Sequence, residues 1–191
     1  MRIARACLAT SGLLLLAACS TTAPVATTPP PAAQPAAVST AQEASVALAS
    51  ASGSRVSGKL SLVPMAGGVH VRGEVGGLAP NGQFGFHVHE KGDCSAADAT
   101  SAGSHFNPAG AQHGRAGSGA HHGGDMDNLA SNAEGVAVVD RHLHGVTLGG
   151  GAANDIAGRA VIVHADADDY HSQPTGNAGA RVACGVIKVV R

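Results

Sequence analysis

The sequence predicts an all-β domain built as an antiparallel sandwich or barrel. Short runs of β-type residues recur along the chain and alternate with glycine-containing turns, and 27 of the 191 residues are glycine. No apolar repeat of helical period persists for three turns. Many short strands separated by turn signals favour a layered β fold. The 11 histidines, in a chain with only 2% aromatic residues, indicate metal or proton chemistry.

Residues 1–18 have the pattern of a lipoprotein signal peptide. Arg2 and Arg5 precede a short apolar run at 13–16, which is too short for a comfortable membrane span. The run ends in Leu-Ala-Ala-Cys, which resembles a bacterial lipobox, so we expect Cys19 to carry lipid and to anchor the chain to a membrane. A simple signal peptide followed by an incidental cysteine is the alternative.

Residues 19–52 are expected to be a disordered tether, because Pro, Ala and Thr dominate without apolar periodicity. A random coil of about 30 residues spans roughly 30 Å. The folded domain is therefore expected at 53–191, held off a membrane without a fixed orientation.

Seven runs in this domain read as strands, and Val69, Val71 and Val75 show the period of two in one of them. The runs are 55–64, 68–75, 82–90, 134–143, 145–148, 158–165 and 181–190. In the third run, His87 and His89 are two residues apart and therefore project from one face of the strand. The neighbouring Phe and Val side chains face the other way, which indicates a strand that presents ligands.

Two long segments, 91–132 and 165–181, do not read as strands. Each begins just after a histidine-bearing strand, and loops of this length in a compact domain are usually functional or disordered. The first loop is rich in potential metal ligands: His105, His113, His121, His122 and Asp125. Imidazole with carboxylate suits zinc, and an all-imidazole set also suits copper.

The cysteines favour one disulfide in an exported domain. Once the signal peptide is removed and Cys19 carries lipid, Cys94 and Cys184 remain. Their bond would close a loop of about 90 residues and contribute roughly 4–5 kcal/mol in the chain-entropy description. Two free, buried thiols are the alternative.

Six stretches resemble, in order, the motif series of the Cu,Zn superoxide dismutase family, and the resemblance covers about 53–191. They are Gly85-Phe86-His87-Val88-His89, Gly92-Asp93-Cys94, His105-Phe106-Asn107-Pro108, His122-Gly123-Gly124-Asp125, Gly158 to Ala165 (GRAVIVHA) and Gly176 to Ile187 (GNAGARVACGVI). The position of Cys94 resembles the exported bacterial branch. The resemblance implies a Greek-key, immunoglobulin-like sandwich or flattened barrel of about eight antiparallel strands with two long functional loops.

The resemblance also implies one copper and one zinc ion per subunit. The implied copper ligands are His87, His89, His105 and His164, and the implied zinc ligands are His105, His113, His122 and Asp125. His105 would bridge the two ions as an imidazolate, and Asp168 would link a copper ligand to a zinc ligand. His121 is the alternative to His122. The other histidines, which match no motif, are expected to be ordinary surface or strand residues: His70, His142, His144 and His171.

The implied reaction is the disproportionation of superoxide to oxygen and hydrogen peroxide by alternate reduction and reoxidation of copper. Zinc, which is redox-inert, would structure the site, and His105 would take up and deliver a proton. Residues 53–191 contain ten Lys or Arg and twelve Asp or Glu, so attraction of the anion must be local. The resemblance assigns this catalytic role to Arg181 beside the copper; a structural salt bridge is the alternative.

The net charge of −1 gives no basic field for nucleic acid. The expected partners are therefore superoxide and a membrane, and the fold leaves surfaces free for a homodimer. The expected location is the bacterial envelope, facing the periplasm or the cell surface, with a role in oxidant defence. Two other functions remain open: a copper and zinc buffer without turnover, and a copper-only dismutase with a decayed zinc side.

Overall fold

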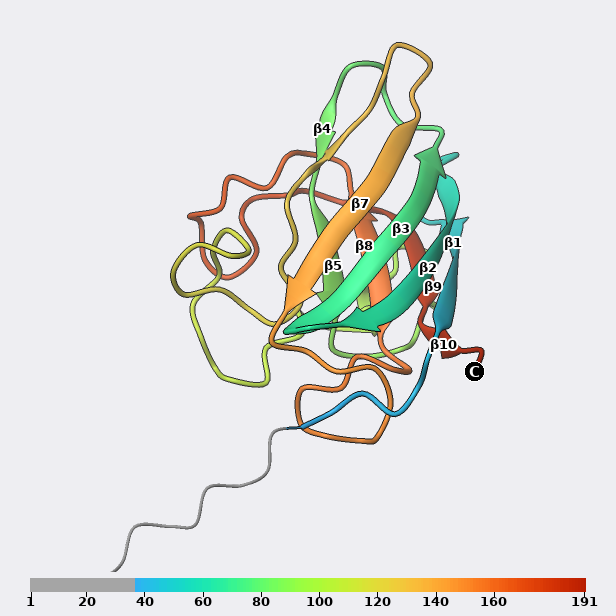
Figure 1. Cartoon of the computed structure of the whole chain (residues 1–191). Coiled ribbons are helices and arrows are strands. Elements are labelled where there is room, and N and C mark those ends of the chain that lie inside the picture. Colours follow the sequence, from blue (N-terminus) through green and yellow to red (C-terminus); the bar gives the residue numbers. More distant parts are fainter. Residues whose placement is uncertain (1–36) are drawn as a thin grey trace, which may run out of the picture. The chain divides into compact units, whose positions relative to one another are not determined.

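The computed structural model describes residues 37–191, and the regular secondary structure in this range is almost entirely β-strand, with long loops between the strands (Figure 1). The strands are β1 Ala44–Ser50, β2 Ser57–Met65, β3 Gly68–Gly76, β4 Gln83–Phe84, β5 Phe86–His89, β6 Leu129–Ala130, β7 Ala137–His144, β8 Ala160–His164, β9 Arg181–Val186 and β10 Lys188–Val189. One short 3₁₀ turn, η1, spans Thr100–Ala102. No helix in the described range is long and apolar enough to cross a membrane.

The strands form a curled antiparallel sheet in the order β5-β8-β9-β1-β2-β3-β7, and β4 pairs separately with β6. β1 joins the two halves of this sheet, because its first residues pair with β2 and its last two pair with β9. β7 pairs with β3 although β4, β5 and β6 lie between them in the chain. The predicted all-β antiparallel class is therefore confirmed.

The core lies between the two halves of the curled sheet and follows the period of two. In β3, the valines at 69, 71 and 75 are fully buried, and they alternate with half-buried or exposed positions. Phe86 and Val88 of β5 join the same apolar cluster. β5 therefore has one face fixed in the core, and its two histidines are held rigidly on the other face.

The folded domain begins earlier than the predicted boundary at residue 53. β1 lies within the segment predicted to be a tether, and Ala44, Val46 and Leu48 are buried while the residues between them are exposed. Alanine and serine fill the remaining positions of β1, so the alternation of apolar and polar residues in this strand is weak. The strand is therefore hard to distinguish by sequence from the Ala-rich segment before it. The predicted signal peptide, Cys19 and the tether up to residue 36 lie outside the described residues.

The run at 145–148, predicted as a strand, is a loop with a single bridge between Thr147 and Asp155. The Asp155 carboxylate accepts hydrogen bonds from the backbone N–H groups of Gly149 and Gly151, both at 2.8 Å. Gly149 and Gly151 have φ values of 78° and 72°, a conformation that glycine adopts without strain. This carboxylate-centred turn replaces strand pairing there.

The predicted disulfide is present between Cys94 and Cys184, with Cα atoms 5.8 Å apart. It joins the start of the first long loop to β9. Figure 1 shows both long loops on the same side of the sheet. They are tied together by Gln173, whose side chain accepts a hydrogen bond from the His113 N–H and donates one to the His113 carbonyl.

Candidate metal centre

The histidines of two neighbouring strands form the base of the site. β5 pairs with β8 in an antiparallel register, and His164 is the last residue of β8. His87, His89 and His164 are buried, with exposed fractions of 0%, 0% and 4%. Because an unpaired buried imidazole is costly, their position away from the apolar core requires polar partners or an ion.

Backbone pairing brings the first long loop against β5. Phe106 N–H donates to the Val88 carbonyl, and Val88 N–H donates to the Gly124 carbonyl, both at 2.8 Å. Two isolated bridges accompany these bonds: His89 with His105, and His87 with Asp125. A Cβ at position 124 would overlap the Val88 carbonyl oxygen, so glycine is needed for this close approach. The loop ligands are therefore positioned by main-chain pairing.

Four imidazoles form the first ligand group. One ring nitrogen from each of His87, His89, His105 and His164 lies within 4.8 Å of the others. The Nε2 atoms of His89 and His164 are 3.4 Å apart, and the His87 Nδ1 and His105 Nε2 atoms are buried without a hydrogen-bond partner. Orphaned buried nitrogens that converge in an all-imidazole group fit a copper ion.

Three imidazoles and one carboxylate form the second group: His105, His113, His122 and Asp125. The Nδ1 atoms of His105, His113 and His122 lie 2.9, 3.1 and 3.4 Å from the nearest oxygen of Asp125. All four side chains are at most 6% exposed. Three nitrogens around one carboxylate, in a closed four-ligand set, fit a zinc ion.

Hydrogen bonds fix which nitrogen each ring offers. His89 Nδ1–H donates to the Gly103 carbonyl at 2.9 Å, and His164 Nδ1–H faces the Gly179 carbonyl at 3.3 Å, so both rings offer Nε2. Asp168 is 2% exposed and accepts from Nε2 of His87 at 2.8 Å and of His113 at 2.9 Å. These two rings therefore offer Nδ1, one to each ligand group.

The ionisation of the site without metal follows from burial and from the two carboxylates. Burial is the largest influence on His89 and His164 and lowers their pKa values to about 2 and about 3. Burial alone would also lower the pKa of His113, but Asp125 and Asp168 together raise it to about 9. Burial opposes the ionisation of Asp125, yet hydrogen bonds from three histidines hold its pKa far below the usual range.

Arg181 lies beside the first ligand group. Its guanidinium donates to the carbonyls of Ala99 and Gly103 at 2.7 and 2.6 Å. The Gly103 oxygen also accepts the proton of His89, so a single carbonyl connects the cation to a ligand of the first group. Burial is the main reason that the pKa of Arg181 is lowered from its usual value. The alternative of a salt bridge is not favoured, because its direct partners are carbonyl groups.

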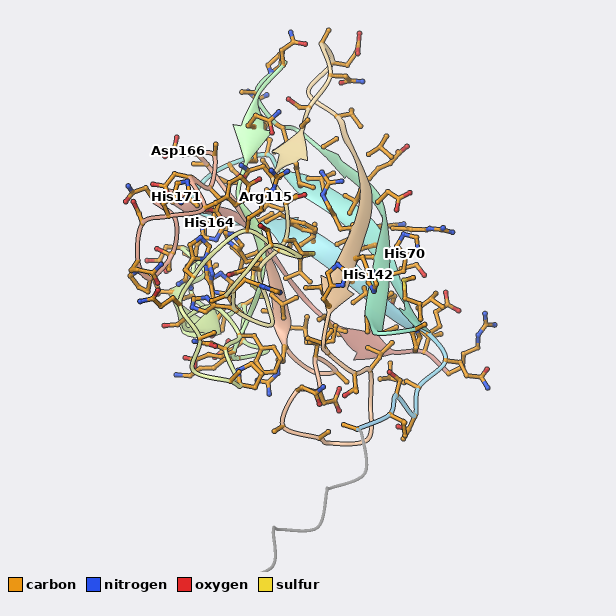
Figure 2. All side chains as sticks on the ribbon, turned by 60° about the vertical axis from the view of Figure 1, so that its left-hand side comes forward. His70, Arg115, His142, His164, Asp166 and His171 are labelled. Carbon is orange, nitrogen blue, oxygen red and sulfur yellow. A yellow bond between two sulfur atoms is a disulfide. The ribbon has the colours of Figure 1, made fainter. Side chains whose placement is uncertain are left out.

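His121 lies outside both ligand groups, and its ring hydrogen-bonds to the Gly119 carbonyl in its own turn. His171 is exposed, and Figure 2 shows it labelled on the loop side of the molecule. His70, His142 and His144 are on β3 and β7, in neither group.

Sequence reasoning missed the residues that support Asp168. Asn128 Nδ2 donates to the Asp168 carbonyl, and the Asp168 N–H donates to Asn128 Oδ1, both at 2.9 Å. Arg141 of β7 donates to the Asn128 carbonyl at 2.6 Å. In the sequence, Asn128 is 13 positions from Arg141 and 40 positions from Asp168. No local pattern in the sequence therefore reveals these contacts.

Comparison with known proteins gives a consistent family signal. The profile of the family described as copper/zinc superoxide dismutase (SODC) matches residues 56–187. The chain is 40% identical over 136 residues to "Superoxide dismutase [Cu-Zn] 2" of Aquifex aeolicus, covering 70% of this chain and 80% of that protein. It is 43% identical over 139 residues to "Superoxide dismutase [Cu-Zn] 2" of Mesembryanthemum crystallinum, covering 69% and 86%.

Solved structures show the same likeness. The clock protein EA4 superposes with a TM-score of 0.70 at 38% identity, covering 81% of this chain and 98% of that one. A SOD-like protein from Bacillus subtilis gives a TM-score of 0.67 at 36% identity, covering 74% of this chain and 95% of that one.

Proposed function

The chain belongs to the copper/zinc superoxide dismutase family, and we propose that it converts superoxide to oxygen and hydrogen peroxide at the two ligand groups. The observation that carries this function is the position of His105, which belongs to both groups. Its Nε2 atom is unpaired among the imidazoles of the first group, and its Nδ1 atom lies 2.9 Å from Asp125 in the second. The first group would hold copper and the second zinc.

Copper supplies a one-electron redox couple, whereas zinc supplies charge and position without redox chemistry. The protein's own residues do the rest. Asp168 holds one ring of each group in a fixed tautomer. Arg181 provides a half-buried positive charge that favours the approach of a small anion. His105 Nε2 has no other partner and can hold a proton there for delivery to the reduced product.

Superoxide disproportionation by the metal-loaded protein tests this function. We expect rates far above the uncatalysed reaction, with one equivalent of copper in the first ligand group and one of zinc in the second. A buffer protein without turnover would bind both metals but show background rates. A copper-only dismutase would be active but would bind no zinc in the second ligand group.

His121 and His122 provide a matched pair of variants for the metal assignment. Replacing His122, which is 5% exposed in the second group, with alanine should release zinc, because one of four ligands is lost. His121→Ala should leave zinc content unchanged, because this ring belongs to neither ligand group and hydrogen-bonds to the Gly119 carbonyl instead. The opposite result would show that the zinc ligand had been wrongly chosen.

Lipid attachment at Cys19 and a location in the bacterial envelope are further parts of the proposal. They are supported by the sequence alone: Leu-Ala-Ala-Cys at 16–19 follows a charged and apolar signal pattern. Mass spectrometry of the mature protein should find an acylated Cys19 at the N-terminus, and Cys19→Ser should release the protein from membranes. A homodimer stays a prediction, which sedimentation analysis of the purified domain checks.

A further inference from the structure

Three imidazoles gather on the outer face of β3 and β7, away from the metal centre. His70 of β3 lies directly opposite His142 of β7, and Gly68 lies opposite His144 in the same register. His142 and His144 are two residues apart and therefore project from one face of β7. Figure 2 shows His70 and His142 close together, well separated from His164. The dismutase chemistry uses none of the three.

Two rings of this outer histidine cluster (His70, His142 and His144) are in close contact. The ring centroids of His142 and His144 are 4.0 Å apart. His142 Nε2 is buried and has no hydrogen-bond partner, and a Cβ added at Gly68 would come within 3.1 Å of it. The same Cβ would overlap the Leu143 carbonyl oxygen, so glycine at position 68 lets β3 approach β7 closely beside the His142 ring. A buried ring nitrogen without a partner is unfavourable, and a ligand would relieve that cost.

One carboxylate and one guanidinium flank His70 of the cluster. His70 Nε2 lies 2.5 Å from a carboxylate oxygen of Asp140, an arrangement that leaves His70 Nδ1 free to bind an ion. Arg72, whose Nε lies 3.3 Å from the same ring nitrogen, offsets the Asp140 charge. Burial, followed by His144 and His70, lowers the pKa of His142 and so favours its metal-binding form.

The donor nitrogens of the three rings do not all lie within 4.8 Å of one another in the described structure, so binding one ion requires the side chains to rotate. Directly opposite residues on antiparallel strands have Cβ atoms about 4.5–5.5 Å apart. Two histidines at i and i+2 on one strand, with a third across from one of them, can converge after rotation of their side chains, because all three lie on the same face. Imidazole sets of this kind suit zinc and copper.

We propose that His70, His142 and His144 form a third metal site, on the outer face of the sheet, for a divalent transition ion of the zinc or copper class. The site lies at the surface and is independent of the dismutase centre. Its ion would be exchangeable, because His144 is exposed and His70 and His142 are only half-buried.

Zinc titration of the protein with both central sites already filled tests this proposal. We expect calorimetry or equilibrium dialysis to find one additional equivalent of Zn²⁺, a third metal ion per protein, bound at micromolar concentrations. The affinity for this equivalent should fall by roughly tenfold or more in His142→Ala and in His144→Ala. His171→Ala, which removes an exposed histidine outside the cluster, is the matched control and should bind as the parent does.

Nuclear magnetic resonance of the imidazole nitrogens gives a second readout that does not depend on activity. Added Zn²⁺ should shift the ring signals of His70, His142 and His144 and leave those of His171 unchanged. The proposal is overturned if no additional equivalent of Zn²⁺ binds up to submillimolar concentrations, if binding is unchanged in the His142→Ala/His144→Ala double variant, or if the ring signals do not shift. Dismutase activity is measured alongside, so failure of the proposed function would be seen separately.

Discussion

Gly176 leaves the space that the Asp168 carboxylate occupies beside the metal ligands. Its φ is 65°, and a Cβ at this position would overlap Asp168 Oδ1 and come within 2.7 Å of His113 Nε2. These two atoms share the hydrogen bond that orients His113. Gly176 therefore satisfies both a backbone and a steric requirement.

Gly176→Ala should displace Asp168 from His113 and weaken zinc binding by roughly 10–100-fold, as for the loss of other supporting partners of metal ligands. Chelator competition measures this affinity. Gly151→Ala is the control, because Gly151 has a φ of 72° and a Cβ added there would meet nothing within 4 Å. Equal zinc loss in both variants would show that backbone strain, rather than the overlap, is responsible.

Arg181 lies beside the copper ligands, because its guanidinium and the copper ligand His89 both donate to the Gly103 carbonyl. Within residues 37–191 it is the one cation that shares a carbonyl with a copper ligand in this way. Arg181→Glu should lower the second-order rate by roughly tenfold or more at low ionic strength, because a carboxylate repels the anionic substrate. The difference should shrink as salt is added, since charges are screened beyond about 8 Å at physiological salt. Rate measurements at matched copper content check this.

Lys91→Glu makes the same change of net charge at an exposed residue and is the control for Arg181→Glu. It should alter the rate far less. If Arg181→Glu retains the parent rate at low salt, the cation has no steering role.

At the scale of elements, β7 supports a site to which it contributes no ligand. Arg141 extends from β7 to the Asp127 and Asn128 carbonyls, at 3.2 and 2.6 Å, and Asn128 in turn holds the backbone of Asp168. This chain of contacts couples the sheet to both long loops.

Arg141→Ala should leave two carbonyls without their donor and loosen both loops. Faster amide hydrogen exchange is expected at 113–132 and 165–180, with a loss of about 1–3 kcal/mol in stability. Arg55→Ala is the control, because Arg55 is exposed. Unchanged exchange in the two loops would show that the Arg141 contacts do not hold them in solution.

The sequence was most informative where a single motif predicts both a strand and the metal ligands on it. The period of two in β5 predicts that His87 and His89 share a face, and the family motifs, taken in order, point to the loop ligands. Asn128, Gln173 and Arg141 act through contacts between segments distant in the chain, and single positions of this kind leave no periodic trace. β1 was missed for another reason: its small residues differ little in composition from the segment before it.

At the scale of the whole molecule, the disulfide and the sheet hold the reactive side together. Cys94 and Cys184 are separated by 90 positions, so their bond strongly lowers the conformational entropy of the unfolded chain. In the chain-entropy description this stabilises the folded state by roughly 4–5 kcal/mol. It joins the loop that carries Ala99 and Gly103 to the strand that begins at Arg181. The same disulfide therefore stabilises the fold and connects Arg181, which attracts the substrate, to the loop whose carbonyls hold its guanidinium.

The metal-free protein should be most stable near pH 6.5. Burial lowers the pKa values of three histidines in the folded state: about 2 for His89, about 4 for His105 and about 3 for His164, against 6.5 in the unfolded chain. Between pH 4 and 6.5 the unfolded chain therefore binds more protons than the folded one. Stability must rise with pH in this window, by up to about 1.4 kcal/mol per unit for each group.

His113 has the opposite sign, and it sets the upper side of the optimum. Its pKa is raised to about 9, so between pH 6.5 and 9 the folded state holds a proton that the unfolded chain has lost. Its contribution to stability is complete below pH 6.5 and is lost as the pH rises through 9.

Denaturant unfolding of chelator-treated protein from pH 4.5 to 9 measures both the rise in stability below pH 6.5 and the fall above it. His164→Gln should reduce the acid slope by about one proton, whereas His171→Ala, at an exposed position, should not. A flat profile, or greater stability at pH 5 than at 6.5, would mean that these rings are not buried as neutral groups in the metal-free protein.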